Sequence, residues 1–187
     1  MTGSMHLMIK IQKLIYSLLL IIGVAFNASA ASKVEIDAKV NAALKVFYNK
    51  VPSGQELAAK AQGVLVFPEI LKAGFIVGGE YGDGALVKGG AIQSYYNIAS
   101  ASIGFQAGVQ EKTVVMLFMT SDALNKFTRS EGWEVGVDGS VAIAEFGAGK
   151  SIDTNTIQEP IIAFVVSNKG LMAGVSLEGS KITPIVK

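Results

Sequence analysis

The sequence predicts an α+β domain in which an N-terminal helical segment precedes a curved antiparallel β-sheet that closes as a barrel or a sandwich. Three observations predict this fold. Apolar residues between positions 33 and 51 recur at helical spacing, whereas after Gly63 they follow a period of two. No stretch after Phe127 resembles a long helix, so short turns join successive strands, which favours antiparallel pairing. The 21 glycines are typical of turns and bulges in a β-rich fold.

Residues 1–30 are predicted to be a secretory signal peptide. Lys10 and Lys13 precede an apolar run at residues 14–26, and the small residues Ala28-Ser29-Ala30 follow it. This order is typical of an export signal with its cleavage site. The run is too short to span a hydrocarbon core of ~30 Å as a helix. An uncleaved N-terminal anchor is the alternative. We expect residues 31–187 to form one periplasmic or secreted domain, peripheral to a membrane.

The composition excludes several classes of function. The chain has no Cys, and its one His is His6, inside the predicted signal peptide. The exported domain therefore has neither thiol nor imidazole, which excludes Ser-His-Asp and Cys-His catalysis and His-ligated zinc. Loss of Lys10 and Lys13 from the 16 basic residues, against 15 acidic ones, leaves a net charge of −1. We therefore expect no enzyme activity, no metal or other cofactor, and no nucleic-acid partner.

The helical segment is predicted in two parts. The first helix, residues 33–51, has Lys39 and Lys50 along one edge of its apolar stripe and ends at Pro52. The stripe consists of Ile36, Val40, Ala43, Leu44, Phe47 and Val51. A capping box over residues 53–56 then starts a short helix at 57–62, which Gly63 ends in a left-handed conformation.

Alternating and continuous apolar runs predict the strands. The first is buried and ends at Pro68, and residues 78–84 form a glycine-rich turn region. A short helix is expected at 121–127. The predicted strands are 64–67, 85–88, 92–98, 102–110, 113–119, 133–143, 161–166, 171–177 and 181–186.

Four blocks of the sequence, in order along the domain, resemble the signatures of the SYLF domain family. They are residues 61–68 with 72–84, residues 95–97 with 102–108, residues 136–138, and residues 170–179. The resemblance implies a module for lipid and membrane binding rather than catalysis. Eukaryotic members are tied to phosphoinositides and actin, and bacterial members are small exported proteins or lipoproteins. This chain has no Cys to acylate and no basic cluster, so its attachment to an envelope would be non-covalent.

Two regions are candidates for lipid contact. An interfacial helix buries an apolar face while lysine stems extend to water at its edge, and glycines let a head group approach backbone amides. The candidate lipid-binding residues are Lys39, Phe47, Tyr48, Lys50, Gly79, Tyr81 and Gly82. The alternatives, which we favour, are that the helix stripe packs on the sheet and that the glycines serve turns and bulges.

The sequence thus predicts non-catalytic binding of phospholipid or of a membrane surface in the bacterial envelope. The alternative is a structural or protein-interaction module of the periplasm, with an envelope protein as its partner. Residues 144–151 fit a relaxed P-loop pattern, but the stretch that follows is turn-rich and β-branched rather than helical. A P-loop needs a helix N-terminus at this place. We therefore interpret these residues as a glycine-rich hairpin or surface loop.

Overall fold

The computed structural model describes residues 31–74, 77–103, 109–144, 158–167, 170–172 and 175–187. The predicted signal peptide and most of the P-loop-like stretch lie outside these residues. The first described element is α2 (Lys33–Lys50), whose N-cap Ser32 accepts a hydrogen bond from the Glu35 amide at 3.3 Å. Its predicted apolar stripe is buried, and the chain leaves the helix at Val51. Within the described residues, no helix has the length and apolarity needed to cross a membrane.

The second helix, α3 (Gly54–Lys60), starts differently from the prediction. Ser53 adopts a left-handed conformation with φ of 66° and makes no side-chain capping bond, so the predicted capping box is wrong. A tight turn explains this, because the Gly54 amide donates to the Val51 carbonyl at 2.9 Å. A Cβ on Gly54 would meet the Phe47 ring at 3.1 Å. Gly63 does not end this helix but begins the first strand.

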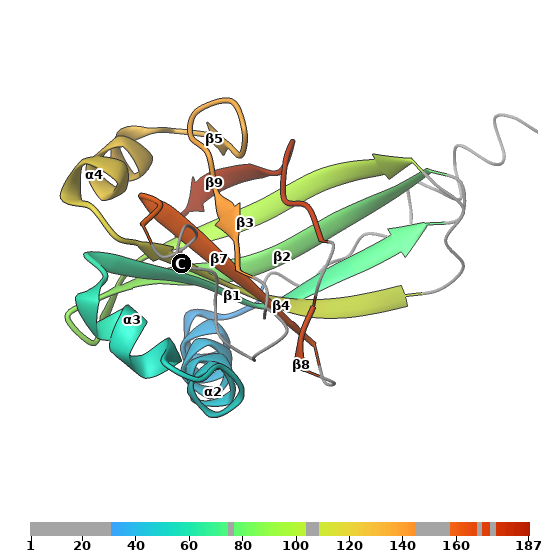
Figure 1. Cartoon of the computed structure of the whole chain (residues 1–187). Coiled ribbons are helices and arrows are strands. Elements are labelled where there is room, and N and C mark those ends of the chain that lie inside the picture. The colour runs from blue at the N-terminus through green and yellow to red at the C-terminus, as the bar shows by residue number, and fades with distance from the viewer. Residues whose placement is uncertain (1–30, 75–76, 104–108, 145–157, 168–169, 173–174) are drawn as a thin grey trace, which may run out of the picture. The chain divides into compact units, whose positions relative to one another are not determined.

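Among the described residues, the sheet contains nine strands in the order β5-β9-β3-β2-β1-β4-β7-β6, with β8 paired to β7. Each pairing between these described strands is antiparallel except that of β6 with β7, which is parallel and makes the sheet mixed. The predicted α+β class with a curved sheet is confirmed, and the sheet curls as a half-barrel (Figure 1). The remaining elements are β1 (Gly63–Gly74), β2 (Val77–Lys88), β3 (Ala91–Ile103), β4 (Val109–Phe118), α4 (Ser121–Arg129), β5 (Trp133–Glu134), β6 (Ala142–Ile143), β7 (Ile161–Ser167), β8 (Gly170–Leu171) and β9 (Lys181–Ile185).

Several strand boundaries differ from the sequence prediction. β1 continues through Pro68, because its register with β4 shifts between Phe67 and Ile70 and the bulge tolerates a residue without an amide hydrogen. Residues 78–84 lie inside β2 and form no turn. Of the predicted strand 102–110, residues 102–103 end β3 and residues 109–110 begin β4, so its two ends belong to different strands, and residues 104–108 lie outside the described residues. The predicted strand 133–143 is reduced to β5 and β6.

The two faces of the sheet carry separate apolar layers. α2 packs on the face that bears Tyr95, whose hydroxyl donates to Asp37 of the helix at 2.7 Å. We call this the α2 face. The opposite face, which we call the α4 face, packs its buried residues against Leu124 and Phe127 of α4 and against Trp133. Figure 1 shows α2 and α3 on one side of the sheet and α4 on the other.

Candidate functional site

Lys39 and Lys50 lie on the same edge of α2, as their spacing predicts. Both line a groove of about 250 Å³ between the helix and strands β1, β4 and β7. Val46, Pro68 and Val166 give this groove apolar walls. The structure therefore brings two of the candidate lipid-binding residues together beside an apolar surface.

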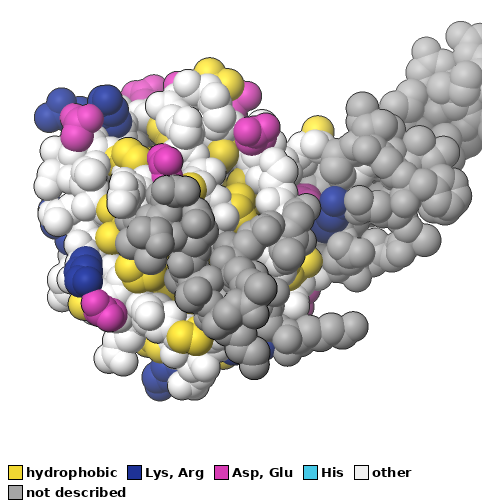
Figure 2. All heavy atoms as spheres, in the orientation of Figure 1, with side chains coloured by type: hydrophobic (Ala, Val, Ile, Leu, Met, Phe, Trp, Pro, Cys, Tyr) yellow, Lys and Arg dark blue, Asp and Glu magenta, His cyan; other side chains and the backbone are white. Residues whose placement is uncertain are grey.

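Ion pairs compensate the charge of Lys39. The Lys39 ammonium lies 2.8 Å from a Glu69 carboxylate oxygen and 3.0 Å from a Glu35 oxygen. The hydrogen bonds to Glu69 and then to Glu35 raise the pKa of Lys39 above its ordinary value. Lys50 donates to the Ser167 carbonyl at 2.8 Å. The groove is thus not a strongly basic site, and Figure 2 shows basic side chains next to acidic ones on the face that it displays.

An exposed apolar pair lies on the α2 face. Leu71 of β1 pairs with Tyr81 of β2, and paired residues present their side chains on one face. Tyr81 shares its face with Ala85, the cross-strand partner of Tyr95. Leu71 is 44% exposed and Tyr81 is 48% exposed. Burial and a 2.7 Å hydrogen bond to Asp83 raise the pKa of Tyr81 to about 12, so its hydroxyl is neutral at physiological pH.

The groove and this pair form one surface. Glu111, which lines the groove, is the partner of Leu71 across β1 and β4. Val46, on the groove wall, is 42% exposed. We call Val46, Leu71 and Tyr81, with the lysine-lined groove, the outer surface. Sequence reasoning did not identify Val46, Glu69 or Leu71 as part of a site, because only the strand register and the bulge bring them together.

Two candidate residues on α2 do not join this surface. Phe47 is fully buried, and its ring centroid lies 4.9 Å from that of Phe164 in an edge-to-face arrangement. The structure thus places the apolar stripe of α2 on the sheet, as in the alternative that the sequence favours. In this arrangement the ring cannot reach a bilayer. Tyr48 is half-buried, and burial raises the pKa of its hydroxyl.

The candidate glycines sit within β2 between two partner strands. Gly79 pairs with Ala73 and with Ala101, and a Cβ on Gly79 would lie 3.6 Å from the Ser100 carbonyl oxygen. Gly82 is buried, and a Cβ there would lie 2.5 Å from the Glu69 carbonyl oxygen. Gly82 therefore permits close approach of β2 to the bulge of β1. In the described part of the chain, no group of three or more acidic, His or Cys residues is placed to hold a metal ion.

Comparison with known proteins gives a consistent set of matches. Residues 99–185 match the Ysc84 family, described as Las17-binding protein actin regulator. SH3 domain-containing YSC84-like protein 1 of Xenopus laevis is 31% identical over 127 residues, which cover 65% of this chain and 38% of that protein. LAS seventeen-binding protein 3 of Saccharomyces cerevisiae is 31% identical over 137 residues, which cover 68% of this chain and 29% of that protein. The human SH3 domain-containing YSC84-like protein 1 is 29% identical over 129 residues, which cover 65% of this chain and 37% of that protein.

The chain spans well under half of the length of these relatives. Their names describe binding or regulatory proteins rather than enzymes. The family match runs from β3 to β9 and contains three of the four sequence blocks that resemble the SYLF domain, in whole or in part. Together the matches and the blocks establish that this chain belongs to the SYLF domain family.

Proposed function

We propose that this chain is a non-catalytic module that binds phospholipid or a membrane surface in the bacterial envelope, through the outer surface. One observation carries the proposal: Val46, Leu71 and Tyr81 are large apolar side chains exposed beside a groove that Lys39 and Lys50 line. Tyr has an apolar ring and a polar tip, which suits the boundary between acyl chains and water. The resemblance to lipid-binding SYLF domains supports the same function.

The expected free energies of membrane binding favour apolar contact over attraction between charges. Full burial of a Leu or Val side chain contributes roughly 1.5–3 kcal/mol. A lysine close to an anionic leaflet contributes about 1 kcal/mol. The ion pairs of Lys39 with Glu35 and Glu69 reduce that contribution further. We therefore expect binding that depends weakly on salt and on the charge of the lipid.

The predicted export signal at residues 1–30 supports a periplasmic or secreted location for the protein. We expect cleavage after Ala30, since Ala28-Ser29-Ala30 is a small-residue cleavage site. Mass spectrometry of protein extracted from the envelope should find a mature N-terminus at Ala31. Full-length protein alone, resistant to carbonate extraction, would show that residues 1–30 are a retained anchor.

A pair of variants tests the outer surface. We expect Leu71→Asp to weaken vesicle binding by about tenfold, because loss of one partly buried apolar contact corresponds to roughly 1.4 kcal/mol. The matched control is Val137→Asp, which adds the same charge at an exposed residue just after β5. Co-sedimentation of each variant with phospholipid vesicles measures the effect. Equal binding by the two variants and the wild type would refute a role for the outer surface.

The second candidate function is a protein-interaction module. The observation that favours it is the naming of relatives, since one is called LAS seventeen-binding protein 3. The outer surface could then contact an envelope protein rather than lipid. Lipid that co-purifies with the wild type and is lost in Leu71→Asp would favour the membrane function. A protein that co-purifies with the wild type and is lost in Leu71→Asp, with no co-purifying lipid, would favour the interaction function.

A further inference from the structure

Two lysines share one carboxylate on the α4 face of the sheet. Glu80 of β2 lies 3.4 Å from the Lys72 ammonium on β1 and 2.6 Å from the Lys112 ammonium on β4. The side chains of Lys72, Glu80 and Lys112 are only 21%, 12% and 10% exposed. Within the described residues, no other carboxylate forms an ion pair with either lysine. The cluster therefore holds one positive charge more than its carboxylate neutralises.

Strand register builds this cluster. Lys112 has the same orientation along β4 as the core residues Val114 and Met116, because side chains alternate between faces. Lys72 follows Ile70, another core residue of this face, and pairs with Glu80 across β1 and β2. The charged cluster of Lys72, Glu80 and Lys112 thus lies at the edge of the apolar core of the α4 face, on strands β1, β2 and β4.

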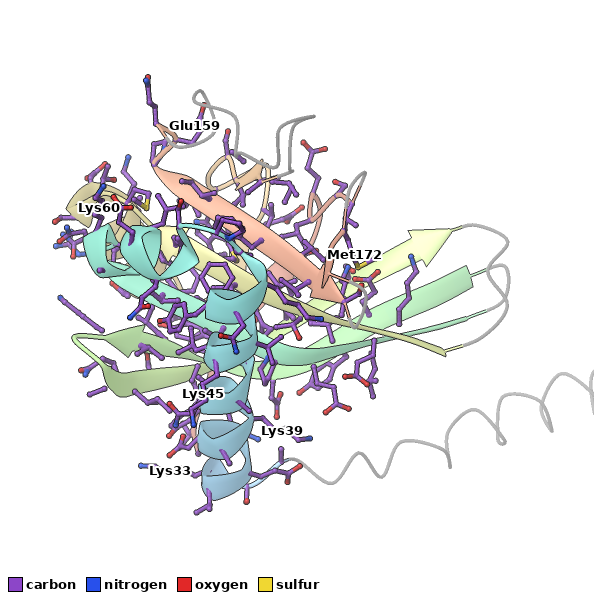
Figure 3. All side chains as sticks on the ribbon, turned by 60° about the horizontal axis from the view of Figure 1, so that its bottom comes forward. Lys33, Lys39, Lys45, Lys60, Glu159 and Met172 are labelled. Carbon is purple, nitrogen blue, oxygen red and sulfur yellow. The ribbon has the colours of Figure 1, made fainter. Side chains whose placement is uncertain are left out.

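The cluster lines a cavity of about 610 Å³ whose other wall is partly apolar. Met172 and Val175, from the segment between β8 and β9, supply that wall. The Met172 amide donates to the Val165 carbonyl at 2.7 Å, which fixes the start of the segment against β7. Figure 3 shows Met172 beside the end of β7. A cavity of this size is large enough to hold a small molecule, and its lining combines charged side chains with a small apolar wall.

We infer that this cavity binds one anionic acyl lipid, whose singly charged head group lies between Lys72 and Lys112 while its chain covers Met172 and Val175. A cation shielded from water is costly unless an anion compensates it. The head group supplies that anion, and Ser100, the register partner of Glu80, lines the same cavity with a hydroxyl. The acyl chain removes the apolar wall from water.

Acidic residues nearby favour a single negative charge on the ligand. Glu111 and Glu178 also line the cavity, and both are exposed. Water screens them from one anion bound at the buried lysines, but they repel each further negative charge on a head group. Inorganic phosphate would gain nothing from the apolar wall. A monoanionic lipid fits this charge pattern better than a polyphosphorylated one.

The cavity lies next to the groove of the outer surface. Glu111 and Lys112 line both the groove and the cavity. In the described residues, β7 pairs with β4 only between Thr113 and Phe118. Glu111 and Lys112, which precede this range, therefore have no β7 neighbour in the described residues. A lipid at the outer surface could therefore reach the cavity around this edge. The inference rests on the proposed lipid-binding function and names a site and a ligand class for it.

Oleate and oleyl alcohol test the inference, because they share an acyl chain and differ in charge. The delipidated full chain is titrated with each compound by isothermal calorimetry, and with inorganic phosphate as a third arm. We expect one oleate per chain, weaker binding of oleyl alcohol, and no measurable binding of phosphate. Equal affinity for oleate and oleyl alcohol would overturn the role of the lysines. Binding of phosphate as tightly as oleate would overturn the role of the apolar wall.

Two variants should act in opposite directions. Lys112→Met leaves a neutral Lys72–Glu80 pair and should weaken oleate binding by about ten- to a hundredfold, the range of a lost charge-assisted hydrogen bond. Glu80→Gln makes the cluster more positive and should tighten oleate binding. Lys60→Met, which removes one member of the exposed Lys60–Glu56 pair on α3, is the control. Melting curves show which variants are folded.

The outcomes separate this inference from the proposed function. If Lys112→Met and Glu80→Gln fold but bind oleate as the control does, the cavity is not the site. Vesicle binding without stoichiometric oleate binding in the wild type would refute the cavity alone. Absence of both vesicle and oleate binding would refute the proposed function as well. Should Glu80→Gln fail to fold, Lys112→Met with unchanged oleate affinity still overturns the inference.

Discussion

Phe47→Ala is expected to lower the free energy of unfolding by about 3–5 kcal/mol and to leave vesicle binding by the folded protein unchanged. The ring is fully buried between α2 and the sheet, in contact with Phe164 and, at 5.5 Å between centroids, with Tyr48. Its removal creates a cavity in the layer that holds α2 on the sheet. Urea denaturation gives the change in stability, and co-sedimentation at a temperature where the variant is folded gives the change in binding.

Val46→Ala provides the matched control for this variant. Val46 is the preceding residue on α2, but it lies on the groove wall and is 42% exposed. We expect a change in the free energy of unfolding within about 0.5 kcal/mol and weaker binding to vesicles. The opposite pattern, with Phe47→Ala stable but unable to bind vesicles, would show that α2 inserts its apolar stripe into the membrane. It would contradict the packing described here.

Gly82→Ala is expected to destabilise the fold by about 1–3 kcal/mol, the usual cost of overpacking a filled interior. The added Cβ would lie 2.5 Å from the Glu69 carbonyl oxygen and 3.0 Å from the Ile70 side chain. These atoms belong to the bulge of β1, so the backbone would have to shift. Thermal melting of the purified variant measures the effect.

Gly79→Ala is the control in the same strand. The added Cβ would lie 3.6 Å from the Ser100 carbonyl oxygen, which is an ordinary van der Waals contact. Alanine would also limit the conformational freedom of the unfolded chain. We expect stability equal to or slightly above the wild type. A different result, in which both alanine variants stay stable and both lose vesicle binding, would indicate that the glycines admit a lipid head group, as the sequence allows.

Local patterns were sufficient to predict α2 but not its surroundings. The stripe of α2 is contained in 18 residues, and Ser32 caps the helix directly before it. The start of α3 was missed because the left-handed conformation of Ser53 depends on the tight turn after α2. Helix patterns are local, whereas this turn depends on how Gly54 packs against Phe47.

The strands show the limit of sequence reasoning more clearly. The sequence predicts that the first strand ends at Pro68, whereas the shift in register of β1 lets the strand continue past this residue. The sequence predicts turns at the glycines of β2, because composition does not reveal the close approach of a neighbouring strand. The same limit applies to the charged cluster, since Lys72, Glu80 and Lys112 come from three strands and meet only through pairing.

Co-sedimentation of the purified protein with vesicles tests the central claim most directly. One set of vesicles contains phosphatidylcholine alone, the other adds phosphatidylglycerol, and both are measured at low and high salt. We predict binding to both sets, somewhat stronger with the anionic lipid and only modestly weakened by salt, because the outer surface contributes apolar contact and its Lys39 is paired with Glu35 and Glu69. Protein that stays in the supernatant with both sets of vesicles would contradict the account.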